Sequence, residues 1–510
     1  MYGRTFGSVL DAIVERFPDE LALVEGDTRL TFTEAISKVR AVGQALLALG
    51  LSPGDSVAIV MKNTSDLVFA MEGALWAGLT TVPLNVKLSA ADHGYMLQDA
   101  QAKVILYHED TSDHVQKVLE HCVIDHVLSV DGFGDGVLDT SNRDVNAKSA
   151  ADIDPDAGVF VQYTGGTTGL PKGVVHSHRS LLSSMQGLTM EWEINPRERF
   201  AHVTPLTHGG IGGILPVWMR GGSIHLLGDF DAGRLLATIE AEKITNLLLV
   251  PTMINVLLDH PNLSTTDLSS LNTIVYGASA ISQTTLARAI DAFGPVLVQC
   301  YGQTECYSQI TSLDKIDHQA ALANPELLAS AGRPVAIAEV RIGGLDCEEV
   351  PLGELGEILV RGPHVFLEYL NKPAETAATK RGGWLHTGDV GRRDASGHIY
   401  IMDRIKDMII TGGFNVYPRE VEDVLDQHPH IREVCVVGVP DDKWGERVTA
   451  VLVVDHTADK KALAEEVRAL VKDKKGSVYS PKSVHFVDSM PLTSVGKLDK
   501  RALIARLASS

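Results

Sequence analysis

The sequence predicts an α/β protein built from layered sheets and helices, with a smaller α+β unit near its C-terminus. Short apolar runs of β-type composition alternate with longer segments whose apolar residues recur at the helical period. A chain of 510 residues exceeds the size that one hydrophobic core supports, so we expect at least two domains. The hydrophobic fraction of 45% is sufficient to bury those cores.

The first helix is predicted by a capping box, Thr31-x-x-Glu34, in which each side chain accepts a hydrogen bond from the other residue's backbone N–H. The apolar residues that follow recur with a helical period: Ile36, Val39, Val42, Leu46 and Leu49. Gly50 ends this helix, and the Pro53-Gly54 turn leads into a strand over 57–61.

The same two periodicities continue along the chain. Further buried strands are predicted over 103–107, 158–163, 245–250, 272–276, 295–300, 356–360, 398–402, 434–439 and 448–454. Helices are predicted over 64–78, 231–243, 282–293, 417–427 and 460–473. Because strands alternate with helices, we expect α/β layers with much parallel sheet. Residues 134–157 are rich in Gly and Asp and lack periodicity, which predicts a surface connection.

The composition excludes several classes of protein. The chain carries 45 Lys and Arg against 65 Asp and Glu, and its net charge of −20 disfavours nucleic acid and anionic membranes as partners. Its five cysteines have no paired spacing, so neither a disulfide framework nor a zinc site is predicted. No run approaches the ~18 apolar residues that a membrane-spanning helix needs. We therefore expect a cytoplasmic protein, and we leave a homodimer open.

The most informative segment is a loop rich in glycine and threonine, which directly follows the strand predicted at 158–163. Residues 164–173 read Thr-Gly-Gly-Thr-Thr-Gly-Leu-Pro-Lys-Gly. Glycines let backbone N–H groups approach an anion, threonine hydroxyls add donors, and Lys172 adds a positive charge. The loop differs from a Walker loop, because no Gly-Lys-Ser/Thr sequence leads into a helix. A flexible surface turn is the alternative, but the composition favours a polyphosphate site.

A second cluster follows the strand predicted at 295–300. It reads Gln299-Cys300-Tyr301-Gly302-Gln303-Thr304-Glu305. Functional side chains often lie where the strands of an α/β sheet end, and a carboxylate there can hold Mg²⁺, which takes few protein ligands. A solvated surface carboxylate is the alternative for Glu305. Another predicted strand ends in the same way with Tyr276-Gly277-Ala278-Ser279.

A third cluster contains a tight Thr-Gly turn. It reads Gly383-Trp384-Leu385-His386-Thr387-Gly388-Asp389, and Asp403-Arg404-Ile405-Lys406-Asp407 follows soon after. The carboxylate of Asp389 can accept hydrogen bonds from two vicinal hydroxyls, which suits a ribose. An Asx-type turn is the alternative for this segment.

The last ~100 residues have the size of one small domain and carry two further motifs. The adjacent glycines Gly412-Gly413 let the backbone approach a ligand and change its dihedral angles at little cost. Near the C-terminus the sequence reads Pro491-Leu492-Thr493-Ser494-Val495-Gly496-Lys497. A flexible Gly-Lys loop can place one ammonium group beside both a carboxylate and a phosphate, whereas the alternative for Lys497 is a solvated surface lysine.

In this order along the chain, the motifs resemble those of the acyl-adenylate-forming superfamily, which includes acyl-CoA synthetases, peptide-synthetase adenylation domains and firefly luciferase. The Tyr-Gly-x-Thr-Glu motif at 301–305 matches at every fixed position, and the resemblance extends over essentially the whole chain. It implies a large N-terminal adenylate-forming domain over 1–405 and a small, mobile α+β domain over 406–510, with a hinge near Lys406. It also implies that the smaller domain adopts one orientation for each of two half-reactions.

The resemblance further implies roles for individual residues. Lys497, Thr304 and Glu305 are the expected catalytic residues, and Glu305 is the expected Mg²⁺ ligand. ATP and AMP are expected to contact Thr164, Gly165, Gly166, Thr167, Thr168, Gly169, Lys172, Gly277, Ala278, Ser279, Gln299, Cys300, Tyr301, Gly302, Asp389 and Arg404. The expected acyl pocket contains His208, Gly209, Gly210, Tyr276, Ala278 and Gln303, with Gly213 and Ser308 as further candidates. The expected hinge and CoA tunnel contain Lys406, Gly412, Gly413 and Phe414.

The implied reaction joins a carboxylic acid to CoA at the expense of ATP. The acid attacks the α-phosphate, pyrophosphate leaves, and the CoA thiol then displaces AMP from the acyl-adenylate. Asp441-Asp442-x-Trp444-Gly445-Glu446 resembles CoA ligases in particular, and residues 207–210 lack the Asp that would bind an amino acid's ammonium group. Two other acceptors stay open, an acyl-carrier protein and an amino acid amine. A remote alternative is a non-catalytic protein that binds nucleotide and acid.

Several residues near these motifs have simpler explanations. His176 and His178 have no third ligand at a matching spacing, so we expect His178 to be a structural residue at a helix start. Cys300 and Cys306 are expected to pack in the interior. The glycines at 209, 210 and 213 predict room for a bulky or ring-containing acid.

Overall fold

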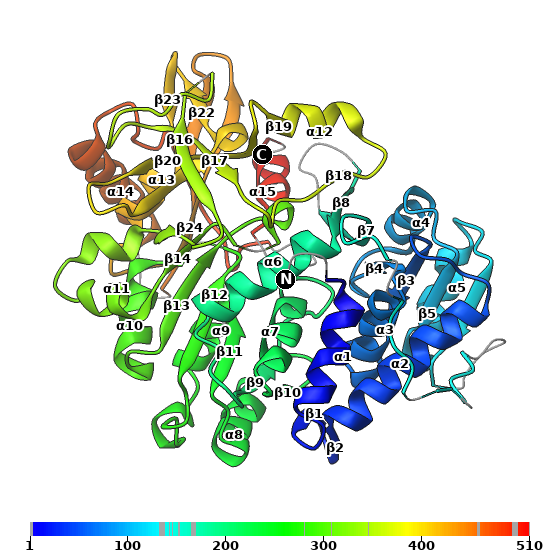
Figure 1. The fold of residues 1–510 in the computed structure, drawn as a ribbon. Coiled ribbons are helices and arrows are strands. Elements are labelled where there is room, and N and C mark those ends of the chain that lie inside the picture. Colours follow the sequence, from blue (N-terminus) through cyan, green and yellow to red (C-terminus); the bar gives the residue numbers. More distant parts are fainter. Residues whose placement is uncertain are drawn as a thin grey trace.

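The computed structural model arranges the strands in four sheets that alternate with helices (Figure 1). It describes residues 4–131, 138–141, 143–144, 146–150, 153–164, 170–279, 281–307, 309–344, 346–455, 459–491 and 498–508. Within these ranges, no helix has both the length and the apolar character that crossing a membrane requires.

The largest sheet has nine strands, and its centre is parallel. In spatial order these are β15 (Arg333–Pro334), β14 (Thr311–Leu313), β13 (Leu297–Tyr301), β12 (Thr273–Gly277), β11 (Asn246–Leu249), β9 (Arg199–His202), β10 (Ser223–Leu226), β1 (Leu21–Glu25) and β2 (Thr28–Thr31). Strands β14, β15 and β2 are attached antiparallel at the two edges. The strands predicted at 245–250, 272–276 and 295–300 are confirmed. Gly277 pairs with Cys300, so the two motifs that follow β12 and β13 lie side by side.

The second sheet has seven strands and contains the strand that precedes the glycine-rich loop. Its order is β18 (Glu368–Tyr369), β8 (Lys172–Ser177), β7 (Gly158–Thr164), β4 (Thr80–Pro83), β3 (Ser56–Val60), β5 (Val104–Tyr107) and β6 (His126–Ser129). Strands β7 and β8 are antiparallel neighbours, and Thr164 pairs with Lys172 at their ends. The two ends of the predicted phosphate loop are therefore fixed by a strand pair.

Helices cover both faces of the two large sheets. The layer between the sheets contains α1 (Phe6–Arg16), α2 (Phe32–Ala48), α3 (Ser65–Trp76), α6 (His178–Glu191) and α7 (Ile214–Met219). The outer face of the nine-stranded sheet packs against α8 (Ala232–Glu242), α9 (Pro251–Leu258) and α10 (Gln283–Phe293). The outer face of the seven-stranded sheet packs against α4 (Ala90–Asp99) and α5 (Ser112–Leu119). The result is an α/β/α/β/α arrangement, which confirms the predicted fold class.

Two local predictions for helix starts are confirmed in atomic detail. Thr31 caps α2, because its N–H donates to Glu34 Oε2 at 2.8 Å while its hydroxyl accepts from the N–H of Glu34 at 3.3 Å. His178 begins α6, and its Nδ1 accepts the N–H of Phe6 at 3.2 Å. Burial lowers the pKa of His178 to about 4, so the ring is a neutral acceptor that joins α6 to α1.

Two smaller sheets follow. The third is antiparallel and consists of β16 (Glu339–Gly343), β17 (Gly356–Arg361), β20 (Trp384–Arg393), β19 (Lys380–Arg381) and β21 (Ile399–Arg404). The fourth consists of β23 (Phe414–Val416), β22 (Ile409–Thr411), β25 (Gly445–Val454), β24 (Ile431–Asp441) and β26 (Ser483–Phe486). It packs with α13 (Pro418–Leu425), α14 (Lys460–Lys475) and α15 (Lys500–Ala508). The two hydrophobic cores between these elements consist of described residues from 409 onward.

Short helices make up the remaining elements. They are α11 (Lys315–Ala320), α12 (Pro373–Thr379), η1 (Glu109–Thr111), η2 (Gly209–Gly213), η3 (Leu263–Thr265), η4 (Thr304–Cys306), η5 (Pro325–Ala329) and η6 (Ile405–Asp407). The 3-10 helix η6 lies between the last strand of the third sheet and the first strand of the fourth. It contains Lys406, so the predicted hinge lies on the stretch at 405–408 that leads directly from β21 of the third sheet to β22 of the fourth. The exact domain boundary stays a prediction.

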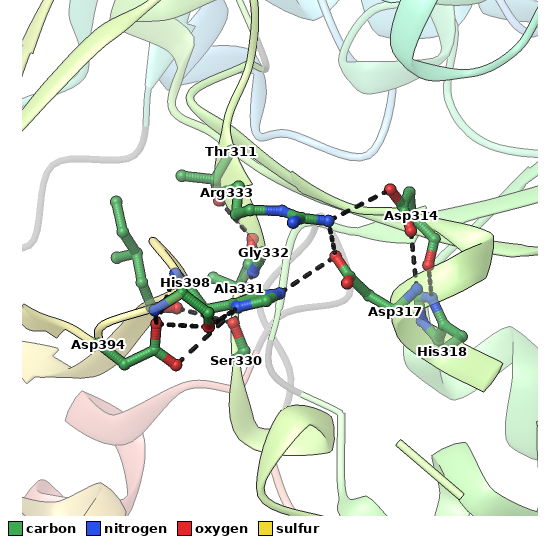
Figure 2. A network of polar contacts seen from close by, with 12 residues as sticks. Thr311, Asp314, Asp317, His318, Ser330, Ala331, Gly332, Arg333, Asp394 and His398 are labelled. Carbon is green, nitrogen blue, oxygen red and sulfur yellow. Dashed lines mark hydrogen bonds and ion pairs between the residues drawn. The ribbon is translucent and has the colours of Figure 1, made fainter. Parts of the chain in front are cut away.

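A buried carboxylate connects the nine-stranded sheet to the third sheet (Figure 2). Asp317 lies on α11 and is 7% exposed. Its Oδ2 is 2.8 Å from an Arg333 side-chain nitrogen and 3.1 Å from His398 Nε2. Arg333 begins β15, whereas His398 precedes β21 and is itself buried. One carboxylate therefore lies between charged or polar side chains of two sheets, and removing its charge takes away the hydrogen-bonded ion-pair partner of Arg333 and the carboxylate beside His398.

Asp317→Asn should lower the free energy of unfolding by about 1–3 kcal/mol, because a buried charged hydrogen-bond network loses its acceptor charge. Chemical denaturation measures this change. Glu339→Gln is the matched control, since Glu339 pairs with Arg361 on an exposed surface and should contribute about 1 kcal/mol or less. Equal losses in the two variants would contradict a structural role for the buried network.

Candidate active site

Three sheets meet where β13 ends, and the predicted motifs at 299–305 and 383–389 lie at this junction. His176 of β8 in the seven-stranded sheet places its Nε2 2.7 Å from the carbonyl oxygen of Thr304. Burial lowers the pKa of His176 to about 4, so its ring is neutral. On the other side, Gln303 Nε2 donates to the carbonyl of Thr387 of β20 in the third sheet at 2.8 Å. The segment at 303–305 is therefore held by both neighbouring sheets.

The carboxylate of Asp389 collects side chains from separate parts of the chain. The Tyr301 hydroxyl donates to its Oδ2 at 2.6 Å, and Gln303 Nε2 donates to the same oxygen at 2.8 Å. Arg404 Nε lies 3.0 Å from Oδ1. Burial and the Asp389 charge raise the pKa of Tyr301 well above its usual value, so the phenol remains a donor. Asp389 is only 3% exposed, so its orientation is fixed before any ligand arrives.

Glu305 is held by a tyrosine of the seven-stranded sheet. The Tyr369 hydroxyl donates to Glu305 Oε1 at 2.6 Å. Burial and the Glu305 charge raise the pKa of Tyr369, so its hydroxyl stays protonated. Lys172 Nζ lies 5.1 Å from the centre of the Tyr369 ring and forms an ion pair with Glu375. Tyr369 therefore joins the expected metal ligand to the end of the predicted phosphate loop.

For a divalent cation, the site offers one carboxylate, that of Glu305. Among the residues that the structure describes, no group of three or more His, Cys, Asp or Glu is arranged to hold a metal ion. Mg²⁺ commonly binds through one or two carboxylates and completes its shell with water and phosphate oxygens. Glu305 fits that mode of binding, with Tyr369 fixing one of its two oxygens.

The segment after β12 lies against the end of β13. A Cβ atom on Gly277 would lie 2.3 Å from the carbonyl oxygen of Cys300, so only glycine fits. Ala278 has a φ of +67° and is exposed together with Ser279 at the edge of the sheet. The structure thus brings the expected nucleotide contacts on both strands to one edge: Gly277, Ala278, Ser279, Gln299, Cys300, Tyr301 and Gly302.

Two residues expected in the acyl pocket make other contacts. Tyr276 is fully buried in the core beneath the nine-stranded sheet, and its hydroxyl lies 2.8 Å from His318 Nε2. Gln303 directs its amide nitrogen to Asp389 and Thr387, on the side of the expected ribose. Their lining of an acyl pocket stays a prediction, and the contacts seen here are structural.

The glycines near His208 differ in the space they leave. Nothing lies within 4 Å of a Cβ atom built on Gly209 at the start of η2, and the room for an acid beside His208 and Gly210 stays a prediction. A Cβ atom on Gly213 would lie 2.8 Å from a ring carbon of His202. The expectation that Gly213 makes room for an acid is wrong, because protein atoms already fill that space.

The C-terminal motifs are only partly covered by the described residues. Gly412 and Gly413 have φ values of +59° and +83°, and Phe414 at the same hairpin is 60% exposed. Lys406 is exposed in η6, two residues after Arg404. The predicted site residues Gly165, Gly166, Thr167, Thr168, Gly169, Ser308 and Lys497 lie outside the described residues.

Two contributors to the site were not predicted from the sequence. Tyr369 lies on a strand of two residues, and no local pattern marks it. No role was expected for His176 beyond the exclusion of a metal pair with His178, yet its ring contacts the backbone of Thr304. Both act across sheet boundaries, so only the tertiary structure identifies them.

Comparisons with known proteins give a consistent result. Residues 10–370 match the family model described as AMP-binding enzyme, and residues 420–497 match the AMP-binding enzyme C-terminal domain. The chain is 41% identical to a medium/long-chain-fatty-acid–CoA ligase, FadD8, of Mycobacterium tuberculosis, over 98% of this chain and 90% of that protein. It is 35% identical to a feruloyl-CoA synthase of an Amycolatopsis species, over 95% of each chain. The amide bond synthetase McbA from Marinactinospora thermotolerans has a similar structure, with a TM-score of 0.90, 32% identity, and coverage of 98% of this chain and 99% of that one.

Tyr369→Phe should weaken the binding of Mg²⁺-ATP about tenfold, because the hydroxyl that orients the Glu305 carboxylate is removed. Calorimetric titration of ATP at several Mg²⁺ concentrations measures the effect, which should diminish at high Mg²⁺. Tyr400→Phe is the control, since its hydroxyl donates to Asp394 away from this junction. If the ATP affinity of Tyr369→Phe depended on the Mg²⁺ concentration in the same way as that of the wild type, Tyr369 would have no role in metal binding.

Proposed function

Because the chain belongs to the AMP-binding enzyme family of the adenylate-forming superfamily, we propose that it activates a carboxylic acid with ATP and transfers the acyl group to CoA. The acid's carboxylate attacks the α-phosphate of ATP and releases pyrophosphate. The CoA thiol then attacks the acyl-adenylate and releases AMP. The observation that carries this proposal is the convergence of Tyr301, Gln303 and Arg404 on the buried carboxylate of Asp389.

Asp389 is the proposed ribose ligand. Its carboxylate has about four lone-pair sites, and the three protein donors seen here leave one of them for a ribose hydroxyl. Because the donors hold the carboxylate in place, binding a ribose requires little reorganisation of the site. Tyr301 presents its ring at the edge of β13, where we place the adenine.

The proposed phosphate site lies between Lys172 and Glu305. The negative charges of the acid and of ATP repel each other, so the reaction requires positive charge around the phosphates. Lys172 supplies one charge at the end of the glycine-rich loop, and Mg²⁺ held by Glu305 supplies more when it is bound. Lys497 is the proposed third source, acting at the α-phosphate in the first half-reaction.

CoA is the proposed acceptor because the fourth sheet carries a surface suited to it. Lys443 and Lys482 lie 5.0 and 5.4 Å from the ring centre of Trp444. The N–H of Gly412 donates to the carbonyl of Trp444 at 2.8 Å, so these cations are next to the glycine hairpin. Two ammonium groups suit the phosphates of CoA, and exposed Phe414 suits its uncharged arm. We propose that a swing about Lys406 brings this surface to the acyl-adenylate for the second half-reaction.

The named relatives suggest which acids to test. A fatty-acid ligase and a feruloyl-CoA synthase are both similar to this chain, so a panel should contain medium- and long-chain fatty acids and aromatic acids. Pyrophosphate release identifies the acid, and mass spectrometry of the product identifies the acceptor. An acyl-CoA with equimolar AMP and pyrophosphate is expected. An amide or an acyl-carrier product, formed while CoA does not react, would contradict the proposed acceptor. Because the chain is similar to an amide bond synthetase, the experiment should also test amines as acceptors.

Lys497→Ala should reduce acid-dependent pyrophosphate exchange at least about 10²-fold, because one positioned charge at the α-phosphate is lost. The reaction of supplied acyl-adenylate with CoA should remain largely intact, since that step does not need the charge. Lys474→Ala, in the last turn of α14, is the control and should change neither rate. Near-normal pyrophosphate exchange in Lys497→Ala would exclude Lys497 from the first half-reaction.

A further inference from the structure

A histidine and a glutamate of the third sheet, His386 of β20 and Glu357 of β17, are aligned with Cys347 of the loop between β16 and β17. Cys347 Sγ lies 3.4 Å from Nε2 of His386. The other ring nitrogen, Nδ1, lies 2.6 Å from Glu357 Oε2. The His386 side chain is 5% exposed. Among the described residues, the hydrogen-bond partner of His386 Nε2 is the sulfur of Cys347. The three side chains therefore form one continuous hydrogen-bonded series.

The direction of this series follows from the chemistry of its members. A carboxylate only accepts hydrogen bonds, so Nδ1 of His386 carries a proton and donates it to Glu357. In the neutral ring Nε2 is then an acceptor, and it faces the Cys347 thiol. The thiol proton can move to Nε2, and Glu357 stabilises the imidazolium that results. The three side chains thus have the order of a nucleophile, a base and a carboxylate that orients the base.

The surroundings of Cys347 distinguish it from the other cysteines. Cys347 is partly exposed, and Gly382 lies beside the sulfur, where a Cβ atom would come within 3.1 Å. Burial raises the pKa of the thiols of the other four, Cys122, Cys300, Cys306 and Cys435. Cys347 also has a φ of +63°, a backbone conformation that costs energy for a residue other than glycine.

We propose that Cys347 is a nucleophilic cysteine that forms mixed disulfides with small disulfide molecules, and that this modification weakens ATP binding. The Cys347 thiolate attacks one sulfur of the disulfide, so that a new S–S bond forms while the old one breaks. The other half of the reagent leaves as a thiolate and takes the proton from His386. Cys347 is oxidised and the reagent is reduced, and the exchange needs no further oxidant.

The coupling to ATP runs through Glu357. Its second carboxylate oxygen, Oε1, accepts the N–H of Gly388 at 2.9 Å, and Gly388 directly precedes Asp389. A disulfide at Cys347 removes the thiol hydrogen that faces Nε2 of His386, and the added group lies beside the ring that holds Glu357. The turn that orients the proposed ribose ligand then loses a fixed acceptor. This coupling rests on the proposed function, whereas the thiol reactivity does not.

Thiol reactivity can be measured on the whole protein without substrates, using a chromogenic aromatic disulfide and glutathione disulfide. One thiol should react at least about tenfold faster than the others, and peptide mass spectrometry should locate it at Cys347. His386→Gln and Glu357→Gln should each slow this reaction at least about tenfold. His398→Gln is the matched control, because His398 is also buried beside a carboxylate but contacts Asp317 and Ser396 rather than a thiol (Figure 2).

Labelling of Cys347 no faster than the other cysteines would overturn the proposal, as would fast labelling that persists in both His386→Gln and Glu357→Gln. Retained thermal unfolding temperatures show that these variants are folded. In a second arm, calorimetry of the labelled protein should show ATP binding at least about fivefold weaker, restored by a reducing agent. Cys347→Ser treated in the same way should bind ATP normally. Unchanged ATP affinity after complete labelling would overturn the coupling, while unlabelled protein that binds no ATP would overturn the proposed function instead.

Discussion

The buried carboxylate of Asp389 is the constraint around which the site is organised. A charge with 3% exposure is costly unless donors surround it, and here a phenol, an amide and a guanidinium do so. These donors come from the end of β13 and from the end of β21, so the charge holds together segments that are far apart in sequence. Because the donors are already in place, the carboxylate is oriented before the proposed ribose binds.

The junction of the sheets explains why the position of residues 303–305 is so closely determined. The nine-stranded sheet delivers residues 303–305, the seven-stranded sheet supplies His176 and Tyr369, and the third sheet supplies Asp389. His176 contacts the carbonyl of Thr304, Tyr369 contacts the carboxylate of Glu305, and Asp389 contacts the side-chain amide of Gln303. A shift of any one sheet would therefore displace the proposed metal ligand or the proposed ribose ligand. The fourth sheet has its own core, which allows it to supply different groups to the two half-reactions that we propose.

Patterns with a local cause were predicted well from the sequence. The capping box at Thr31 and the strands β11 to β13 depend on neighbouring residues or on periodicity. Contacts that cross sheets were not predicted. Tyr369 reaches Glu305 from a strand of two residues, and His202 fills the space beside Gly213. Such contacts depend on how the layers pack, and residue types alone do not specify that packing.

The most direct test of the central claim is a binding cycle that pairs the Asp389 carboxylate with the ribose hydroxyls of ATP. Calorimetry would compare ATP with dideoxy-ATP, which lacks both hydroxyls, for the wild type and for Asp389→Asn. In the wild type, the loss of hydrogen bonds to a charged group should weaken binding by about 1.5–3 kcal/mol, on the order of tenfold or more. In Asp389→Asn the two nucleotides should bind with affinities within about threefold of each other, because the charged acceptor is already lost. An equal discrimination between the nucleotides in both proteins would contradict the assignment of Asp389 to the ribose.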